Sequence, residues 1–173
     1  NEAIERINES VERELKRARL AGAAIARHRV PTRELVDDLV GVLDKIYAER
    51  DLEFVVEIPE DHLLVGDQAD LSELFGNALE NACKWASHRI RVRTDDTEKA
   101  RCLVIEDDGP GLEEHEARRL VARGVRLDEA VPGHGLGLAI MQDIVAEYGG
   151  TLDLRRSERG GLRVTICLPR PEA

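Results

Sequence analysis

Apolar residues in the first 27 positions follow the spacing of a helix that packs against another helix. They recur in alternating steps of three and four, as in a heptad seam, which Glu14 interrupts. Charged residues fill the other positions, so we expect this arm to pack against a second helix or a second chain. Val30-Pro31-Thr32 ends the pattern. The seam residues are Ile4, Ile7, Val11, Ala18, Ala21 and Ile25.

From Thr32 onwards, helical and extended patterns alternate. Apolar spacings of three and four predict helices over 32–49, 71–87 and 136–148, the first of them capped by Thr32. Period-two alternation between turn residues predicts strands over 53–58, 90–93, 102–106, 151–155 and 162–168. This order predicts an α+β domain, a two-layer α/β sandwich whose mixed, mostly antiparallel sheet carries helices on one face. The long polar stretch between 107 and 137 is expected to be a functional lid or a disordered loop.

Composition and charge narrow the classes of function. The formal net charge is −10, which repels a nucleic-acid backbone, and an aromatic content of 3% argues against a base-stacking surface. We therefore expect no nucleic-acid partner. No apolar run approaches the roughly 20 residues that span a bilayer, and no signal-peptide core is present. Because the chain begins at Asn1 and Met141 is its one methionine, we expect a fragment of a longer protein.

The number and spacing of the cysteines predict their redox state. Cys83, Cys102 and Cys167 are odd in number and lack Cys-x-x-Cys spacing. We expect reduced, half-buried thiols in a reducing compartment, and neither metal ligands nor a disulfide framework.

Three polar residues share one side of the predicted helix 71–87. Asn77, Asn81 and Lys84 are four and three residues apart, on the side turned away from Leu74 and Ala78. Amide oxygens ligate a hard cation such as Mg²⁺, which takes further ligands from water and phosphate. An ammonium beside them adds positive charge for the same phosphates. The trio suits a metal-bridged phosphate, and taken alone it fits a solvated helix surface equally well.

Two glycine-containing turns flank the long polar stretch. In Asp107-Asp108-Gly109-Pro110-Gly111, a carboxylate at a strand end can accept a hydrogen bond from an exocyclic amine such as that of adenine. Gly133-His134-Gly135-Leu136-Gly137-Leu138 precedes a helix and exposes backbone N–H groups to an anion. This second turn is neither a Rossmann fingerprint nor a P-loop. Each turn alone is unspecific, whereas the order of all three motifs is specific.

In this order the motifs resemble the ATP-binding domain of sensor histidine kinases, which has the Bergerat (GHKL) fold. Residues 77–84 resemble the N box of that family, 107–111 its G1 box and 133–138 its G2 box. The runs 76–85 and 106–111 are most similar to PhoQ-type membrane sensor kinases.

The resemblance covers residues from about 32 to 169 and reaches into the arm. Residues 7–18 are similar to the second helix of the dimerisation and phosphotransfer domain. The implied domains are 1–30, a remnant of that helix, and 31–173, the ATP-binding catalytic domain.

The resemblance also implies roles for individual residues. Asn77 and Asn81 would ligate Mg²⁺, and Lys84 would contact phosphate, which makes Asn81 and Lys84 the catalytic pair. Trp85 would form a wall against adenine, and Asp107 would accept the adenine amine. The other implied nucleotide contacts are Gly109, Gly111, Arg123, Arg126, Gly133, His134, Gly135, Leu136, Gly137 and Leu138.

Two features depart from the family pattern. Val121 stands in the lid where the family usually has Phe. No histidine has the context of the phosphoacceptor, since His28 is followed by Arg29 and His115 lies in the lid. We therefore expect the acceptor histidine to lie outside this fragment.

The function implied by the resemblance is transfer of the ATP γ-phosphate to that histidine, for onward transfer to a response-regulator aspartate. The implied partners are ATP, the protein's own dimerisation and phosphoacceptor domain and the response regulator. The complete protein would be a membrane-bound homodimer with this domain on the cytoplasmic side of a bacterial inner membrane, and the fragment a monomer.

Two alternatives stay open. One is a Bergerat-type ATPase or chaperone fragment, and the other is a non-catalytic interaction domain with a degenerate pocket. The resemblance implies that the ATPases carry a glutamate general base where this chain has Asn77. Because a carboxamide has no useful basicity, slow hydrolysis is expected.

Overall fold

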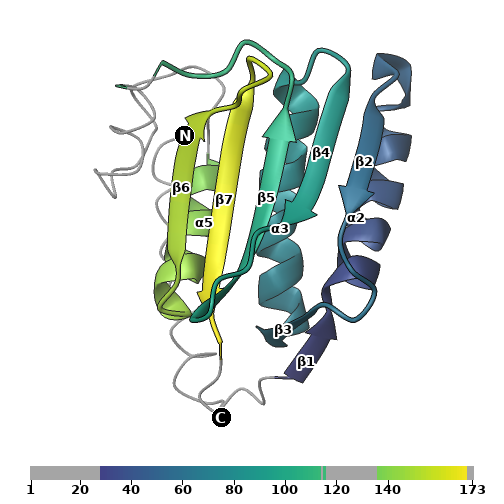
Figure 1. Ribbon diagram of the computed structural model, residues 1–173. Helices are drawn as coiled ribbons and strands as arrows, with labels where there is room; N and C mark the ends of the chain where they lie inside the picture. Colours follow the sequence, from purple (N-terminus) through teal and green to yellow (C-terminus); the bar gives the residue numbers. More distant parts are fainter. Residues whose placement is uncertain (1–27, 114, 116–135, 171–173) are drawn as a thin grey trace, which may run out of the picture.

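The computed structural model describes residues 28–113, 115 and 136–170 (Figure 1). The predicted helix over 2–27 and most of the lid lie outside these residues. Within the described ranges, no helix has both the length and the apolar content needed to cross a membrane. In chain order the elements are β1 (His28–Pro31), α2 (Thr32–Ile46), the 3-10 helix η1 (Ala48–Arg50), β2 (Glu53–Glu57), β3 (Leu63–Gly66), α3 (Gln68–Trp85), β4 (Arg89–Thr94), β5 (Ala100–Asp107), α5 (Leu136–Glu147), β6 (Thr151–Arg156) and β7 (Leu162–Pro169).

Five strands form one mixed sheet in the order β2-β4-β5-β7-β6. β2 runs parallel to β4, and the pairs β4–β5, β5–β7 and β6–β7 are antiparallel. The helices α2, α3 and α5 all lie on one face of this sheet (Figure 1). The predicted two-layer α+β architecture with a mostly antiparallel sheet is confirmed.

The hydrophobic core fills the space between the helices and the sheet. Leu71, Leu74 and Phe75 of α3 have no exposed surface, as the apolar spacing of this helix predicts. Inward-facing strand residues such as Ile90 and Leu103 complete the core. Because α3 packs against α2, α5 and β5, its position relative to the sheet is fixed.

A second, two-stranded sheet was not predicted. β1 and β3 pair antiparallel, with His28 opposite Gly66 and Pro31 opposite Leu63. Each strand has four residues, too few to establish a period-two pattern. Pro31 also lacks the N–H that a central strand needs, so its position favours a break over a strand.

The predicted cap at Thr32 is wrong. Pro31 occupies the N-cap position of α2, and its side chain makes no capping hydrogen bond. Thr32 is buried, and its Oγ1 lies 2.8 Å from Nδ1 of the buried His62, whose Nε2 lies 3.1 Å from Asp96 Oδ1. The hydroxyl therefore ties the start of α2 to the segment before β3.

The prediction of three free thiols is wrong for two of the cysteines. Cys102 and Cys167 face each other in the β5–β7 register, with their Cα atoms 4.1 Å apart, and form a disulfide. An odd cysteine count and the lack of Cys-x-x-Cys spacing carry no information on this pairing, because the two strands are far apart in sequence. Cys83 is a free thiol, as predicted, but it is fully buried and not half-buried, and this burial raises its pKa to about 11.

Reduction of this disulfide is expected to lower the free energy of unfolding by about 2–4 kcal/mol, because 65 positions separate the two cysteines and the released chain gains conformational entropy. Denaturant unfolding with and without a dithiol reductant measures the difference. The double variant Cys102→Ser/Cys167→Ser is the control, and its stability should not respond to the reductant. Equal stability of the oxidised and reduced wild-type protein would contradict the prediction.

Candidate functional site

The predicted trio of Asn77, Asn81 and Lys84 lies on α3 as expected. The helix begins at an Asp67 cap, whose Oδ1 accepts hydrogen bonds from the N–H groups of Ala69 (2.8 Å) and Asp70 (3.1 Å). Its apolar side is fully buried, whereas both asparagines are half-buried and Lys84 is exposed. The trio therefore borders solvent along one side of a helix that the core holds in place.

The Asn77 side chain links α3 to the start of α5. Its Nδ2 donates to the carbonyl of Glu73 at 2.7 Å. Its Oδ1 is directed towards α5, since a Cβ added to Gly137 would lie 2.9 Å from that oxygen. Two separately predicted site residues, Asn77 and Gly137, thus come together. A side chain at position 137 would have to displace the amide.

Lys84 forms an ion pair one helical turn back along α3. Its Nζ lies 3.0 Å from Glu80 Oε1, and both side chains are nearly half exposed. The hydrogen bond to Glu80 raises the pKa of Lys84, so its ammonium is charged at neutral pH. A phosphate would compete with Glu80 for this cation.

Asp107 ends β5 as a buried carboxyl group. Its side chain is 4% exposed, and its Oδ1 accepts hydrogen bonds from the N–H groups of Gly109 (2.8 Å) and Leu162 (3.3 Å). Burial raises the pKa of Asp107, and these two bonds offset the rise only in part. Both bonds go to Oδ1, so within the described part of the chain Oδ2 is the oxygen that can accept a hydrogen bond from a ligand amine.

The glycine turn after Asp107 packs directly on the end of α3. A Cβ on Gly109 would lie 2.1 Å from the carbonyl oxygen of Trp85, a distance that no side chain tolerates. Gly111 has a φ of 69° and faces the carbonyls of Gly160 and Gly161 in the β6–β7 hairpin. The turn thus joins Asp107, the Trp85 backbone and the hairpin in one place.

The G2-like motif is only partly described. Leu136 begins α5, and the side chain of Leu138 is 4% exposed in the core, so only the backbone of Leu138 is available to a ligand. The predicted contacts Gly133, His134, Gly135, Arg123 and Arg126 lie outside the described residues, as does Val121.

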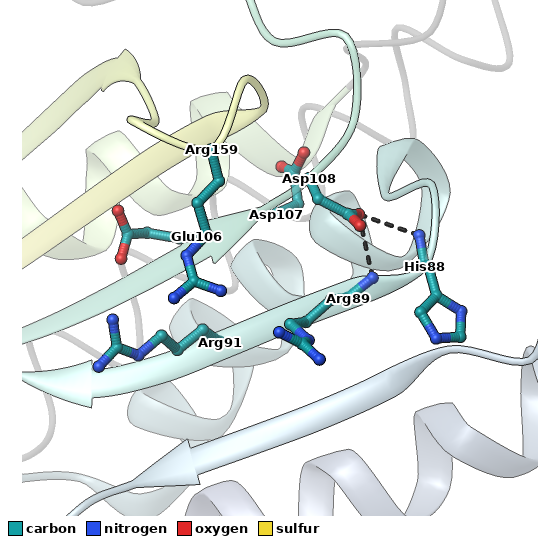
Figure 2. Close-up of a pocket in the computed structure, with 7 residues that line it drawn as sticks. All are labelled: His88, Arg89, Arg91, Glu106, Asp107, Asp108 and Arg159. Atoms are coloured by element: carbon teal, nitrogen blue, oxygen red, sulfur yellow. Dashed lines mark hydrogen bonds between the residues drawn. The ribbon is translucent and has the colours of Figure 1, made fainter.

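Asp108 contributes to the site in a way that the sequence did not indicate. Its Oδ1 accepts hydrogen bonds from the N–H groups of Ser87 (2.9 Å), His88 (2.9 Å) and Arg89 (3.0 Å), two of which Figure 2 shows as dashed lines. Partial burial raises the pKa of Asp108, but the three bonds together lower it below its usual value. In the sequence this residue is only part of a predicted turn, because hydrogen bonds to backbone partners leave no sequence signal.

A small pocket lies on the sheet face opposite the helices (Figure 2). Arg89 and Arg91 face it and alternate with the buried Ile90 and Val92, and they are already paired with Glu53 and Glu57. Its formal charges balance, so it has no excess positive charge to attract a triphosphate. The lining residues are His88, Arg89, Arg91, Glu106, Asp107, Asp108 and Arg159.

Comparisons with known proteins match this chain to one family. Residues 66–172 match the family described as histidine kinase-, DNA gyrase B-, and HSP90-like ATPase. The sensor protein kinase CarS of Pseudomonas aeruginosa is 40% identical over 168 residues, covering 97% of this chain and 38% of CarS. The sensor protein PhoQ of Escherichia coli K12 is 32% identical over 170 residues, or 98% of this chain and 35% of PhoQ.

A solved structure agrees with these relatives. The mycobacterial sensor histidine kinase MprB superimposes with a TM-score of 0.71 at 30% identity, covering 84% of this chain and 99% of that one. The chain spans somewhat more than a third of the length of the curated relatives CarS and PhoQ.

Proposed function

We propose that this chain transfers the γ-phosphate of ATP to a histidine outside residues 1–173. The premise is its family: it belongs to the histidine kinase-, DNA gyrase B- and HSP90-like ATPases, as the ATP-binding catalytic module of a sensor histidine kinase. The observation that carries the proposal is the junction of three motifs. The Gly109 turn rests on Trp85 O, and Gly137 rests on the Asn77 amide. A nucleotide lying along α3 reaches all three motifs at once.

In this proposal Asp107 recognises the purine. Its Oδ1 is occupied by two backbone donors, which fixes the orientation of the carboxylate. The exocyclic amine of adenine donates to Oδ2, and Trp85 borders the base. A buried carboxylate whose Oδ2 accepts no hydrogen bond from the described residues selects a ligand that carries a donor at that position.

The phosphates lie towards Asn77, Asn81 and Lys84. The two asparagines supply neutral oxygen donors one helical turn apart, which suits a cation that retains water and phosphate ligands. A Mg²⁺ ion held by these two amides would supply positive charge to neutralise the phosphate oxygens. Lys84 exchanges Glu80 for a phosphate oxygen, and the backbone N–H groups at the start of α5 face the same anion. Arg123 and Arg126 are proposed to reach the terminal phosphate.

The reaction with an acceptor histidine needs alignment and charge neutralisation more than a base in this domain. Neutral imidazole is nucleophilic near pH 7, and its attack on the γ-phosphorus forms an N–P bond while the bond to the β,γ-bridging oxygen breaks. Water, in contrast, must lose a proton. Asn77 has no basicity for that task, which favours transfer over hydrolysis.

The surrounding protein is also a proposal. Residues 1–30 are assigned to the dimerisation and phosphotransfer helix, and 31–173 to the catalytic domain. The complete protein is proposed to be a membrane-bound homodimer with this domain in the cytoplasm. Its phosphorylated histidine would pass the phosphoryl group to an aspartate of a response regulator.

Labelled ATP tests the proposal directly. With a separately made helical hairpin that carries a phosphoacceptor histidine, the chain should transfer label to the hairpin. Without the hairpin, we expect hydrolysis at least about 100-fold slower than the transfer, because no general base acts on water. Single-turnover measurements give both rates. Rapid hydrolysis without an acceptor, or no transfer to any acceptor hairpin, would count against the proposed function.

A further inference from the structure

The backbone that follows the N-box-like motif is held by two side chains from other parts of the chain. We call residues 83–89 the α3–β4 segment; it carries Lys84 and Trp85 and joins α3 to β4. On one side, the Arg50 guanidinium of η1 donates from Nη1 to the carbonyls of Cys83 (2.9 Å) and Lys84 (2.7 Å), and from Nη2 to that of Ala86 (2.6 Å).

On the other side, Asp108 accepts from the next three backbone N–H groups, those of Ser87, His88 and Arg89. Figure 2 shows its carboxylate directed at the His88 and Arg89 nitrogens. The carbonyls are thus bound by a cation, and the following N–H groups by an anion. Six backbone groups of one short segment depend on two side chains.

The way in which α3 ends explains why such support is needed. The last carbonyls of a helix have no partners within the helix, and many helices end with a glycine that satisfies them locally. Here the C-cap is Ala86, with φ −54° and ψ 141°, so the chain turns directly into an extended conformation. Arg50 supplies the missing donors, and its charge also complements the negative end of the helix.

The two side chains act where the proposed adenine and phosphate contacts meet. Arg50 binds the carbonyl of Lys84 itself, and Asp108 is the chain neighbour of Asp107. Between them lies the Trp85 carbonyl on which Gly109 packs. A shift of the α3–β4 segment would therefore move Lys84 and Trp85 relative to Asp107.

We propose that Arg50 and Asp108 are positioning residues for nucleotide binding: together they hold the α3–β4 segment, and with it Lys84 and Trp85, in place relative to Asp107. This inference rests on the proposed function. Neither side chain is assigned a contact with the nucleotide. Their effect passes through the backbone that they bind.

The test measures binding of a non-hydrolysable ATP analogue with Mg²⁺ to the full chain, at a temperature at which every variant is folded. Asp108→Ala and Arg50→Ala are each expected to weaken binding by about tenfold to a hundredfold, because each removes three hydrogen bonds made by a charged group. Asp108→Asn retains an acceptor oxygen and should bind within about threefold of wild type. Arg50→Lys retains the charge but not the planar fork, and should bind as poorly as Arg50→Ala.

Trp85 provides a second measurement, which does not depend on ligand. It is the one tryptophan of the chain, so its emission spectrum reports on the α3–β4 segment alone. The spectrum should shift in Asp108→Ala and Arg50→Ala and stay as in wild type in Asp108→Asn. Arg33→Ala is the matched control, since Arg33 also donates to a backbone carbonyl, that of Ile58 at 3.2 Å, away from this segment. It should change neither measurement.

Each outcome bears on one proposal. Folded Arg50→Ala and Asp108→Ala proteins with wild-type affinity and a wild-type Trp85 spectrum would overturn the positioning role, even if both were less stable. Rescue by Arg50→Lys would overturn the requirement for the planar fork. A wild-type chain that fails to bind the analogue would contradict the proposed function, and the Trp85 spectra would still decide whether the two residues hold the segment. If an alanine variant does not fold, the two conservative variants test the positioning role. Wild-type binding by Asp108→Asn together with weakened binding by Arg50→Lys supports it, and wild-type binding by both contradicts it.

Discussion

Asn81→Asp is expected to reduce phosphotransfer to a histidine-bearing hairpin by at least about 100-fold, equivalent to about 2.7 kcal/mol in activation free energy. The new carboxylate can still ligate Mg²⁺, but it adds a formal negative charge beside phosphates that already repel one another. Asn81 is half-buried and lies outside the core cluster, so the free energy of unfolding should change by no more than about 0.5 kcal/mol. Initial rates with labelled ATP and denaturant unfolding measure the two effects separately.

Gln68→Glu is the matched control for this charge. It makes the same amide-to-carboxylate change on the same helix, at its exposed first residue, about 20 Å from position 81 along the helix axis. At that distance the charge is screened, and its place at the helix N-terminus is mildly favourable. Its transfer rate should match that of wild type. An Asn81→Asp protein as active as this control would remove Asn81 from its assigned role.

Asp107→Asn is expected to weaken ATP binding by about tenfold to a hundredfold while leaving the fold intact. If the amide oxygen keeps the bonds from Gly109 and Leu162, the Nδ2 group faces the adenine amine, and two donors then oppose each other. Titration with a non-hydrolysable ATP analogue measures the loss. The preference for ATP over the guanine analogue, which has an oxygen in place of that amine, should fall in parallel.

The raised pKa of Asp107 determines in which direction the free energy of unfolding changes with pH. Burial raises its folded-state pKa, so ionisation of this carboxyl opposes folding, and stability is lost as the pH rises from the unfolded value through the folded one. Above both values that cost is constant. Asp107→Asn removes it and should not lower the free energy of unfolding at neutral pH. If Asp107→Asn lowers the free energy of unfolding but its folded form binds ATP with wild-type affinity, Asp107 has a structural role and not a binding one.

The elements that the sequence predicted are those with long, regular patterns. α3 has 18 residues and α5 has 12, and each presents a buried apolar side that its spacing makes visible. β1 and β3 were missed because they are short and gain stability from pairing with each other, a contact that no local pattern records. The disulfide between Cys102 and Cys167 was missed for the same reason, since it depends on strand register.

In the candidate site too, some features could be predicted from the sequence and others depend on the fold. Asn77, Asn81, Lys84 and Asp107 were predicted because their side-chain chemistry is visible in the sequence. The packing of Gly109 on Trp85 and of Gly137 on Asn77 needs the fold. The hydrogen bonds of Arg50 and Asp108 were not predictable, because their partners are backbone groups that every residue possesses.

A structure of the chain with Mg²⁺ and a non-hydrolysable ATP analogue tests the central claim most directly. We expect the purine amine at Asp107 Oδ2, the metal at the Asn77 and Asn81 amides, and Lys84 moved from Glu80 to a phosphate oxygen. A nucleotide bound elsewhere, or a site that stays closed by side chains at saturating ligand, would contradict it.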